Sequence, residues 1–391
     1  IAPMGVIKAG AAYQPLDPTY PRDRLMYMLE DSAARLLIAD RELLHLVDGY
    51  QGPVLFTDEI PGLADIKAEL KKPQLHDLFI LLYTSGSTGV PKGCMLEYGN
   101  ITAFCRWYRR YYGIDSDSRI AAYASFGFDA SMMDIYGAIT NGAQLHIIPE
   151  EIRLDFMGLQ SYFDENGITH SFMTTQVGRQ FALEMKCKSL KYLSIGGEKL
   201  VPCEPPKGYT FINAYGPTET TIFITLFEVD KYYPNVPIGK ALDNAKLYIA
   251  DKFGHMLPPG ACGELMITGW QVSRGYLNKP EKTAEVYTKN LYDELGADET
   301  LNLHAWTSSS DTSVDNTHTN IYGARYNAYM MTRILKEQNI PGLSERIKEA
   351  QKPLKSEVLQ PNPDYKEAEY TPVTEVSQLW KQIGIWSGSV F

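Results

Sequence analysis

The chain has 391 residues, enough for two or three domains at the usual size of roughly 150 residues each. Apolar residues make up 44% of it and charged residues 21%, as in an ordinary globular protein, and no apolar run approaches the roughly 18 residues of a membrane span. A formal net charge of −10 argues against nucleic acid or an anionic membrane as the main partner, although a local basic pocket is compatible with that total.

Five cysteines are scattered along the chain, odd in number and without a Cys-x-x-Cys pair. This pattern indicates plain thiols in a reducing compartment, so we expect a cytoplasmic protein. The chain begins with Ile1 and has no charged-then-apolar signal segment. We therefore expect it to start inside a domain.

The first predicted unit is a helix followed by a strand, which is typical of an α/β protein. Pro21 suits a first helical turn, apolar residues follow at helical spacing from Leu25, and residues 36–39 form a short apolar run. A second short strand is expected over residues 54–56. A polar connection then leads to a third strand over residues 79–82.

The loop after the third strand reads LYTSGSTGVPKG over residues 82–93. Its hydroxyl groups, closely approaching backbone N–H groups and one lysine suit a polyphosphate. A Walker P-loop is excluded, because Lys92 stands between Pro91 and Gly93. An ordinary Gly- and Ser-rich turn is the alternative. The residues expected around the polyphosphate are Thr84, Ser85, Gly86, Ser87, Thr88, Gly89 and Lys92.

Beyond this loop, Asn100 is expected to cap a helix that ends at Gly113. The apolar stripe of that helix consists of Ile101, Phe104, Cys105, Tyr108 and Tyr112.

Asp129 follows this helix in an apolar setting, within the sequence FDASMMD. A carboxylate in such surroundings is costly unless it is paired. Two interpretations remain open, one a helix cap and the other a partner for a cationic group of a ligand.

Strands are expected next over residues 145–148, 169–173, 192–195 and 209–212, with one helix before the second of these strands and another before the third. The last of these strands leads into a loop that reads NAYGPTETT. An amide (Asn213), a ring that can stack (Tyr215) and a carboxylate for a hard cation (Glu219) could together bind a nucleotide. From about residue 236 we predict a small β region with an antiparallel pair over residues 246–250 and 263–268, followed by a short helix that ends near residue 287.

The order of these motifs resembles the amino-acid adenylation domains of nonribosomal peptide synthetases, which are adenylate-forming enzymes. The segments that carry the resemblance are KAGAAYQPLDPTYPRDRLMYMLEDS, LYTSGSTGVPKG, FDASMMDIYGAITNGAQL, NAYGPTETT and GELMITGWQVSRGYLNKPEKTAEVY. It covers residues 1–288 and implies an α/β fold, the N-terminal core of this enzyme class. We expect two parallel-type sheets sandwiched by helices plus the small β subdomain, truncated at both ends, with the first sheet incomplete on its N-terminal side.

The resemblance also implies activation of an amino acid with ATP and Mg²⁺ to give aminoacyl-AMP and pyrophosphate. Positioning and charge neutralisation matter most for such a reaction. By this resemblance, the loop from Thr84 to Lys92 would hold the β- and γ-phosphates, and Thr218 would contact the α-phosphate. Glu219 would bind Mg²⁺, and Asp129 would pair with the substrate's α-ammonium group. The residues that would hold adenine are Asn213, Tyr215 and Gly216.

Carried over by motif position, an apolar pocket for the substrate side chain would be lined by Ala130, Met133, Phe172, Ser194, Gly196, Ala214, Ile222 and Phe223. This lining, which is apolar apart from Ser194, predicts a neutral amino acid and favours a hydrophobic one. The implied partners are a peptidyl carrier protein with phosphopantetheine and the other synthetase domains of a parent protein, with neither nucleic acid nor membrane involved.

The resemblance stops near residue 288, and the family's later ribose-binding Asp and mobile C-terminal subdomain with its Lys do not follow. We therefore expect turnover to be impaired. Residues 289–391 form a second region, in which Asp315 and His318, followed by a predicted helix, are similar to the last block of SGNH (GDSL-type) esterases. An Asp and a His at this spacing would serve a Ser nucleophile, but no nucleophile motif is present. The alternative is a loop Asp that caps the following helix, beside a His on the surface.

The sequence thus suggests a chimera with a partly helical, extended C-terminal tail. The alternatives to a ligase are an esterase fragment without its nucleophile and a non-catalytic nucleotide-binding module.

Overall fold

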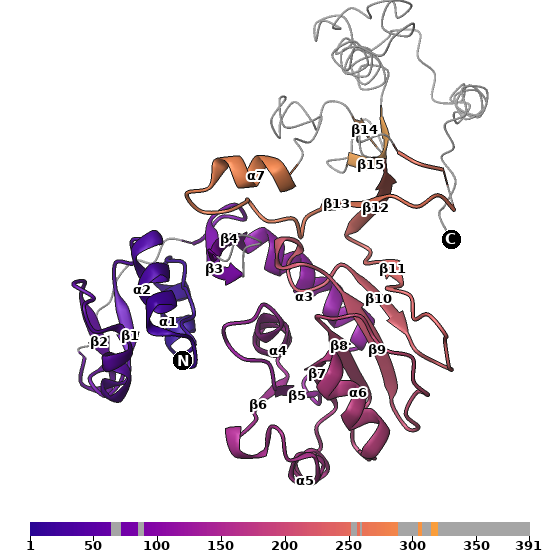
Figure 1. Ribbon diagram of the computed structural model, residues 1–391, viewed down its shortest axis with the longest axis horizontal. Coiled ribbons are helices and arrows are strands. Elements are labelled where there is room, and N and C mark those ends of the chain that lie inside the picture. The colour runs from indigo at the N-terminus through magenta and orange to yellow at the C-terminus, as the bar shows by residue number, and fades with distance from the viewer. Residues whose placement is uncertain are drawn as a thin grey trace, which may run out of the picture. The chain divides into compact units, whose positions relative to one another are not determined.

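Figure 1 shows the computed structural model of the chain. The structure describes residues 1–63, 72–84, 90–251, 256–258 and 260–287, together with two short strands at 304–306 and 314–319. Contacts between residues divide the chain into two units, Ile1–Val286 and Tyr287–Phe391.

The N-terminal part is a small α/β layer, as the sequence predicts. Pro21 precedes α2, and Leu25 and Leu29 of this helix pack against Leu37 and Val47 in a small core. Strands β1 and β2 pair in parallel. The elements are α1 (Ala2–Lys8), α2 (Arg22–Asp31), β1 (Leu37–Ala39), η1 (Arg41–Val47), β2 (Val54–Phe56) and η2 (Ile60–Gly62).

A β-hairpin carries the two ends of the predicted phosphate loop. Strand β3 (Leu78–Thr84) pairs antiparallel with β4 (Lys92–Glu97), and Thr84 lies opposite Lys92. Strand β4 was not predicted, because its sequence KGCMLE begins with Lys and Gly and lacks a clean alternation of apolar and polar residues. The loop residues Ser85, Gly86, Ser87, Thr88 and Gly89 lie outside the described residues.

Helix α3 (Tyr98–Tyr112) follows directly and ends at Gly113, whose φ of 65° and ψ of 38° give the predicted left-handed terminus. The predicted stripe is buried. The predicted cap is wrong, because Glu97 occupies the N-cap and Asn100 is already the third helical residue. The side-chain oxygen of Asn100 instead accepts a hydrogen bond of 2.7 Å from the backbone N–H of Glu97.

A seven-stranded sheet forms the largest layer, in the order β11-β10-β9-β8-β7-β5-β6. The strands from β5 to β9 are parallel, whereas β10 and β11 extend the sheet antiparallel beyond β9. The sequence analysis predicted β6, β7, β8 and β9 but did not predict the short strands β5, β10 and β11. The strands are β5 (Arg119–Ala122), β6 (Gln144–Ile147), β7 (His170–Thr174), β8 (Tyr192–Gly196), β9 (Thr210–Tyr215), β10 (Thr225–Glu228) and β11 (Lys240–Ala241).

Helices cover both faces of this sheet (Figure 1). On one face, α5 and α6 bury Leu159, Phe163 and Phe181 against Leu193 and Phe211 of the strands. The other face lies under α3 and α4. The elements named here for the first time are α4 (Ala130–Ile139), η3 (Glu150–Ile152), α5 (Phe156–Asn166), α6 (Thr175–Glu184) and η4 (Thr218–Thr220).

The predicted β region is present as an antiparallel pair, β12 (Ala245–Ala250) with β13 (Glu264–Gly269). The chain then returns to β4. The N–H of Met95 donates to the carbonyl of Gly275 at 2.9 Å, and the N–H of Leu277 donates to the carbonyl of Gly93 at 2.8 Å. Residues 274–277 therefore lie along β4 before helix α7 (Pro280–Val286) begins.

In the second unit the structure describes one antiparallel pair, β14 (His304–Trp306) with β15 (Val314–Thr319). Asp315 and His318 fall on β15, a strand that the sequence analysis did not predict, and nothing is described of their side chains. The helix predicted after them lies outside the described residues. In the described part of the chain, no helix combines the length and apolarity needed to span a bilayer.

Two leucines near the start of α5 test the core. Replacing Leu159, which is fully buried, by Ala should lower the free energy of unfolding by about 2–5 kcal/mol, because it leaves a cavity. Replacing Leu154, which is 79% exposed, should change it by less than about 0.5 kcal/mol. Chemical denaturation of both variants measures the difference, and equal losses would contradict the core described here.

Candidate functional site

Two of the predicted binding segments, that of Asp129 and that of Thr218 and Glu219, follow strands of the parallel sheet. Strands β5, β8 and β9 run in the same direction, so the segments that follow Ala122, Gly196 and Tyr215 leave the sheet at one edge. This edge, at the carboxyl ends of the strands, is where ligands bind in open α/β sheets.

Asp129 and Thr218 meet at this edge from two different loops. The hydroxyl of Thr218, in η4 after β9, donates a hydrogen bond of 2.6 Å to a carboxylate oxygen of Asp129, in the segment after β5. Asp129 occupies the N-cap position of α4, but its side chain makes no capping hydrogen bond. Of the two interpretations left open by the sequence, the contacts therefore do not support the helix cap.

The electrostatics of Asp129 favour a cationic partner. Burial is the largest cause of a raised pKa at this carboxyl, and the negative charge of Glu219 also raises it, while the hydrogen bonds from Thr218 and from the N–H of Ala130 lower it; together they raise the pKa from 3.8 to about 6. An ammonium group placed beside Asp129 would offset the cost of desolvating its charge.

Lys92 and Glu219 are joined through Tyr276. The Nζ of Lys92 donates to the Tyr276 hydroxyl at 3.1 Å and lies 4.3 Å from the centroid of its ring. The same hydroxyl donates to Oε1 of Glu219. Burial and the neighbouring Glu219 carboxylate raise the pKa of Tyr276, which keeps the hydroxyl protonated as a donor. The structure thus brings Lys92, at the end of the predicted phosphate loop, close to the loop that carries Glu219.

Sequence reasoning missed Tyr276, although the motif that contains it was identified. The signal was the Arg-Gly-Tyr turn after the antiparallel pair, in which Gly275 has a φ of 121°. A non-glycine residue would be strained there. The turn lays residues 274–277 along β4 and so directs the Tyr276 ring to Lys92.

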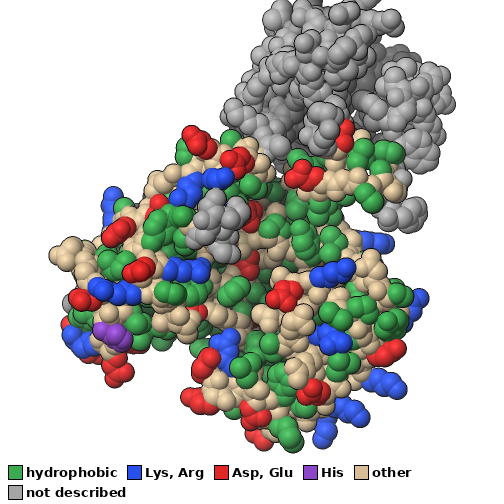
Figure 2. All heavy atoms as spheres, in the orientation of Figure 1, with side chains coloured by type: hydrophobic (Ala, Val, Ile, Leu, Met, Phe, Trp, Pro, Cys, Tyr) green, Lys and Arg blue, Asp and Glu red, His purple; other side chains and the backbone are tan. Residues whose placement is uncertain are grey.

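Lys92 also borders an open pocket of about 500 Å³. Two further cations, Lys279 and Lys282, line the same pocket, and Lys282 pairs with Glu285 at 2.8 Å. Glu281 lines the pocket as well, so three lysines and one carboxylate border it. On the face seen in Figure 2, positive and negative side chains are otherwise interspersed.

The residues predicted to hold adenine lie at the end of β9, and they differ in accessibility. Asn213 and Tyr215 belong to the strand rather than to a loop. The Tyr215 ring is 40% exposed, whereas Asn213 is buried and donates its amide to the carbonyl of Pro237 at 2.8 Å. A side chain at Gly216 would come within 2.3 Å of the Phe223 Cα atom, so only glycine fits there.

Most of the predicted side-chain pocket lies on one face of the sheet. Phe172 and Ser194 are paired in the parallel register of β7 and β8, so their side chains share a face. A side chain at Gly196 would meet the Phe172 ring and the carbonyl of Ala214, which places these positions together. The buried members of the predicted set are Ala130, Met133, Phe172, Ser194, Gly196, Ala214, Ile222 and Phe223.

The one hydroxyl among these residues already has a partner. Ser194 and Tyr112 of α3 are hydrogen-bonded at 2.7 Å in the interior. Phe223 packs edge-on against Phe104 and Trp107 of the same helix, with ring centroids 5.2 and 5.7 Å apart. The region is therefore apolar with a satisfied hydroxyl pair, and α3 contributes to it in a way that the sequence analysis did not predict.

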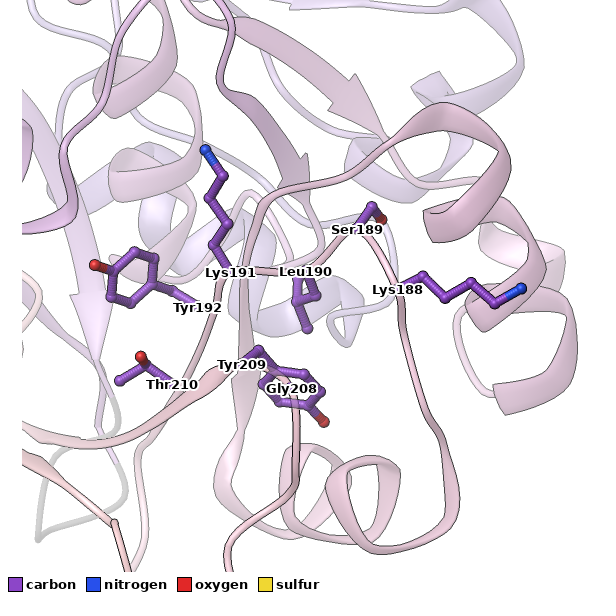
Figure 3. A pocket seen from close by; sticks show the side chains of 8 residues that line it. All are labelled: Lys188, Ser189, Leu190, Lys191, Tyr192, Gly208, Tyr209 and Thr210. Atoms are coloured by element: carbon purple, nitrogen blue, oxygen red, sulfur yellow. The ribbon is translucent and has the colours of Figure 1, made fainter.

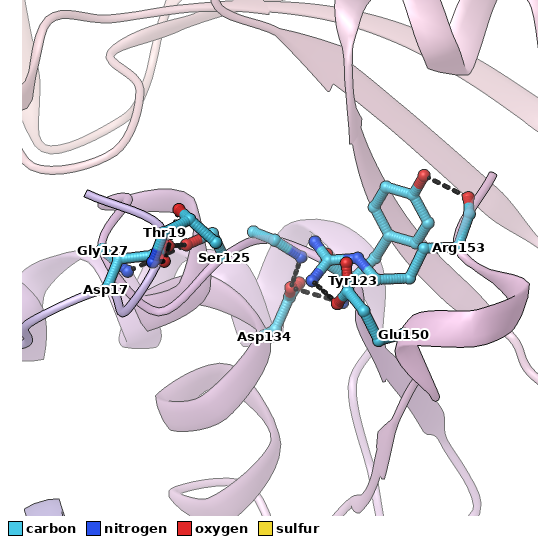
Figure 4. Close-up of polar contacts among 9 residues, drawn as sticks. Asp17, Thr19, Tyr123, Ser125, Gly127, Asp134, Glu150 and Arg153 are labelled. Carbon is cyan, nitrogen blue, oxygen red and sulfur yellow. Dashed lines mark hydrogen bonds and ion pairs between the residues drawn. The ribbon is translucent and has the colours of Figure 1, made fainter. Parts of the chain in front are cut away.

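Residues 123–125, which lead from β5 to Asp129, are held in place by a network of hydrogen bonds (Figure 4). Asp134, buried in α4, accepts hydrogen bonds from the N–H groups of Tyr123 and Ala124 at 3.2 and 3.4 Å. The hydroxyl of Ser125 donates to Asp17. Burial raises the pKa of Asp134 well above its ordinary value. These contacts hold the chain as it leaves β5.

Another surface pocket, of about 690 Å³, lies at the opposite edge of the sheet (Figure 3). Its lining includes Tyr192 and Thr210, the first residues of β8 and β9, together with Lys188 and Lys191. Because parallel strands begin at this edge, the pocket is separate from the site at their carboxyl ends.

A scan against protein families matches residues 1–277 to the family described as AMP-binding enzyme. Surfactin synthase subunit 1 of Bacillus subtilis is 40% identical over 298 residues, which cover 74% of this chain and 8% of that protein. Tyrocidine synthase 1 of Brevibacillus parabrevis is 36% identical over 300 residues, covering 75% of this chain and 28% of that protein. The chain thus spans less than a third of the length of these relatives.

Solved structures agree on the fold. The nonribosomal peptide synthetase FmoA3 superposes with a TM-score of 0.66 at 25% identity, over 73% of this chain and 32% of that one. The N-terminal subdomain of NpsA from Klebsiella oxytoca, solved with 3-hydroxybenzoyl-AMSN, superposes with a TM-score of 0.65 at 23% identity, over 75% of each chain. The predicted α/β architecture is therefore confirmed for about three quarters of the chain.

The raised pKa of Asp129 predicts how its removal affects stability. Because the folded state favours the protonated form, the stabilisation from this group is present below pH 3.8 and is lost as the pH rises through about 6. Asp129→Asn should therefore gain about 2 kcal/mol over the wild type between pH 4 and pH 7. Denaturation at both pH values measures this, with the exposed Asp117→Asn as control. A difference independent of pH would contradict the assignment.

Proposed function

The chain belongs to the AMP-binding enzyme family, and from this premise we propose that it activates an amino acid as aminoacyl-AMP for nonribosomal peptide synthesis. The observation that carries the proposal is the link from Lys92 through Tyr276 to Glu219, beside the Thr218–Asp129 pair. Support for the proposal is that these contacts bring a cation, hydroxyl groups and two carboxylates close to one another. A nucleoside triphosphate and an α-ammonium group need such a combination.

The proposed reaction is a displacement at phosphorus. An oxygen of the amino acid's carboxylate attacks the α-phosphorus of ATP, the bond from that phosphorus to the bridging oxygen of the β-phosphate breaks, and pyrophosphate leaves. No proton transfer is needed, since the attacking carboxylate is already ionised. The protein's contribution is to position two anions and to neutralise their charge.

Each residue then has a stated task. Asp129 binds the α-ammonium group, Thr218 contacts the α-phosphate, and Lys92 with the loop that starts at Thr84 holds the β- and γ-phosphates. Tyr215 provides an exposed ring for adenine to stack on, and Gly216 leaves room beside it. We assign adenine to this ring and glycine rather than to the amide of Asn213, which is engaged inside the sheet.

The donor set at Glu219 suits Mg²⁺. Its carboxylate oxygen is a hard ligand, and it lies beside the volume assigned to the phosphates. Among the described residues no three His, Cys, Asp or Glu side chains form a metal-binding group, so a cation here would take its remaining ligands from phosphate oxygens and water, as Mg²⁺ commonly does. When bound, Mg²⁺ would neutralise charge on the phosphate oxygens.

We further propose that the substrate is a neutral amino acid, because the side-chain region is apolar and its Ser194 hydroxyl is paired with Tyr112. The product would pass to the phosphopantetheine of a peptidyl carrier protein, within a cytoplasmic synthetase of several domains. Support for these partners is that the chain matches only 8% and 28% of the two synthases named above, and that FmoA3 is a nonribosomal peptide synthetase. For Asp315 and His318 we propose no activity, since the sequence offers them no nucleophile.

Substitutions at the two ends of the Tyr276 link test the nucleotide site. Lys92→Met and Glu219→Gln should each weaken Mg-ATP binding by about tenfold or more, since each removes a charged contact to phosphate or metal. Isothermal calorimetry measures the affinity, and Lys188→Met at the opposite edge of the sheet is the matched control. Unchanged affinity in both site variants would rule out the proposal.

An amino-acid panel tests the reaction itself. ATP–pyrophosphate exchange should be stimulated by one or a few neutral amino acids, and Asp129→Asn should raise the KM for that amino acid by about tenfold or more, because the ammonium group loses its partner. Preference for a charged amino acid would overturn the substrate assignment. Mg-ATP binding with negligible exchange would support the binding site and indicate impaired turnover.

A further inference from the structure

The loop that carries Thr218 and Glu219 continues through two residues in an unfavourable backbone conformation. Thr221 has a φ of 57° and Ile222 a φ of 74°, a region that L-residues with branched side chains rarely adopt. Such a conformation persists only where surrounding contacts enforce it. The neighbouring contacts therefore determine where Glu219 is held.

Gln271 supplies those contacts. Its side chain is fully buried, and its amide nitrogen lies 3.1, 3.1 and 3.0 Å from the carbonyl oxygens of Thr220, Thr221 and Phe223. The backbone carbonyl of Gln271 in turn accepts a hydrogen bond of 2.7 Å from the Thr221 hydroxyl. The amide nitrogen of Gln271 thus contacts backbone carbonyls both before and after Ile222.

Gln271 is itself held by the helix that follows β4. The side-chain nitrogen of Asn100 in α3 donates to the carbonyls of Trp270 and Val272, at 2.8 and 3.0 Å. The side-chain oxygen of Asn100 accepts from the N–H of Glu97 at the end of β4. Because β4 begins with Lys92, a continuous set of hydrogen bonds connects the strand of Lys92 to the loop of Glu219.

A second contact links the same two parts. The N–H of Ser273 donates to the carbonyl of Glu219 at 2.8 Å, two residues after Gln271. The backbone of Glu219 is therefore bonded to the segment that Asn100 holds, and its carboxylate is bonded to Tyr276 from the same segment. Residues 270–276 thus hold the loop that carries Glu219 in its position.

We propose that Gln271 is a positioning residue for Mg-ATP, whose amide holds the strained 220–223 turn so that Glu219 faces the same volume as Lys92. This inference rests on the proposed function, because it assigns the cation and the triphosphate to that volume. Gln271 touches neither ligand and acts through the carbonyls of the loop. A purely structural role would instead lower stability without a specific effect on the metal-bound nucleotide.

The test compares Gln271→Met and Gln271→Glu in the full chain, with the same substitutions at the exposed Gln51 as controls. Calorimetry with ATP is done once with Mg²⁺ and once with EDTA. Gln271→Met should lose about tenfold in affinity for Mg-ATP and less than about threefold for metal-free ATP, since the amide bonds support the Glu219 loop. Equal losses under both conditions, or no loss, would overturn the inference.

The Gln271→Glu variant gives a second test, the pH dependence of Mg-ATP affinity. A purely structural role of Gln271 would not produce this pH dependence. At pH 8 a carboxylate at this position faces three carbonyl oxygens and cannot donate, so Gln271→Glu should bind Mg-ATP more weakly than Gln271→Met. At pH 5.5 the introduced glutamate is protonated in part and regains one hydrogen-bond donor. When each affinity is divided by the wild-type value at the same pH, the difference in Mg-ATP affinity between the two variants should therefore be smaller at pH 5.5 than at pH 8. A gap that does not change with pH would contradict the proposed contact.

If both variants fail to fold, Asn100→Asp serves in their place. It keeps the oxygen that accepts from Glu97 and removes the donors to Trp270 and Val272, so the same Mg-selective loss is expected at smaller size. A wild-type chain that does not bind Mg-ATP would refute the proposed function. A wild type that binds it, with Gln271 variants that bind equally well, would refute the positioning role alone.

Discussion

The organisation of the site depends on the hydroxyl of Tyr276. It receives a hydrogen bond from Lys92 in β4 and donates one to Glu219 in η4, two residues that are 127 positions apart in the sequence. This hydroxyl links a lysine on the β3–β4 hairpin to a glutamate between β9 and β10 of the large sheet. With it, a cation and an anion are held close together without neutralising each other in a direct ion pair.

The pairing of the strands brings the segments of the site together. Parallel pairing sends the segments after β5 and β9 to one edge, where Thr218 bonds Asp129. The return of residues 274–277 along β4 then brings the hairpin to the same edge. Backbone hydrogen bonds bring these segments together, and hydrogen bonds between side chains, such as that from Thr218 to Asp129, then join them.

Much of this could be predicted from sequence, for identifiable reasons. The buried strands and the stripe of α3 carry strong hydrophobic periodicity, and the left-handed turn after α3 needs Gly113. Strand β4 was missed because Lys92 and Gly93 break the pattern. The role of Tyr276, the Tyr112–Ser194 pair and the left-handed Thr221 depend on contacts between distant segments, which periodicity does not report.

The central claim is that Lys92 and Glu219 act on one ligand, and a double-mutant cycle on Mg-ATP affinity tests it most directly. The account predicts that Lys92→Met and Glu219→Gln are strongly non-additive, with the double variant binding little worse than the weaker single variant. If the two losses in binding free energy simply add, the two residues act independently, and a shared triphosphate site is contradicted.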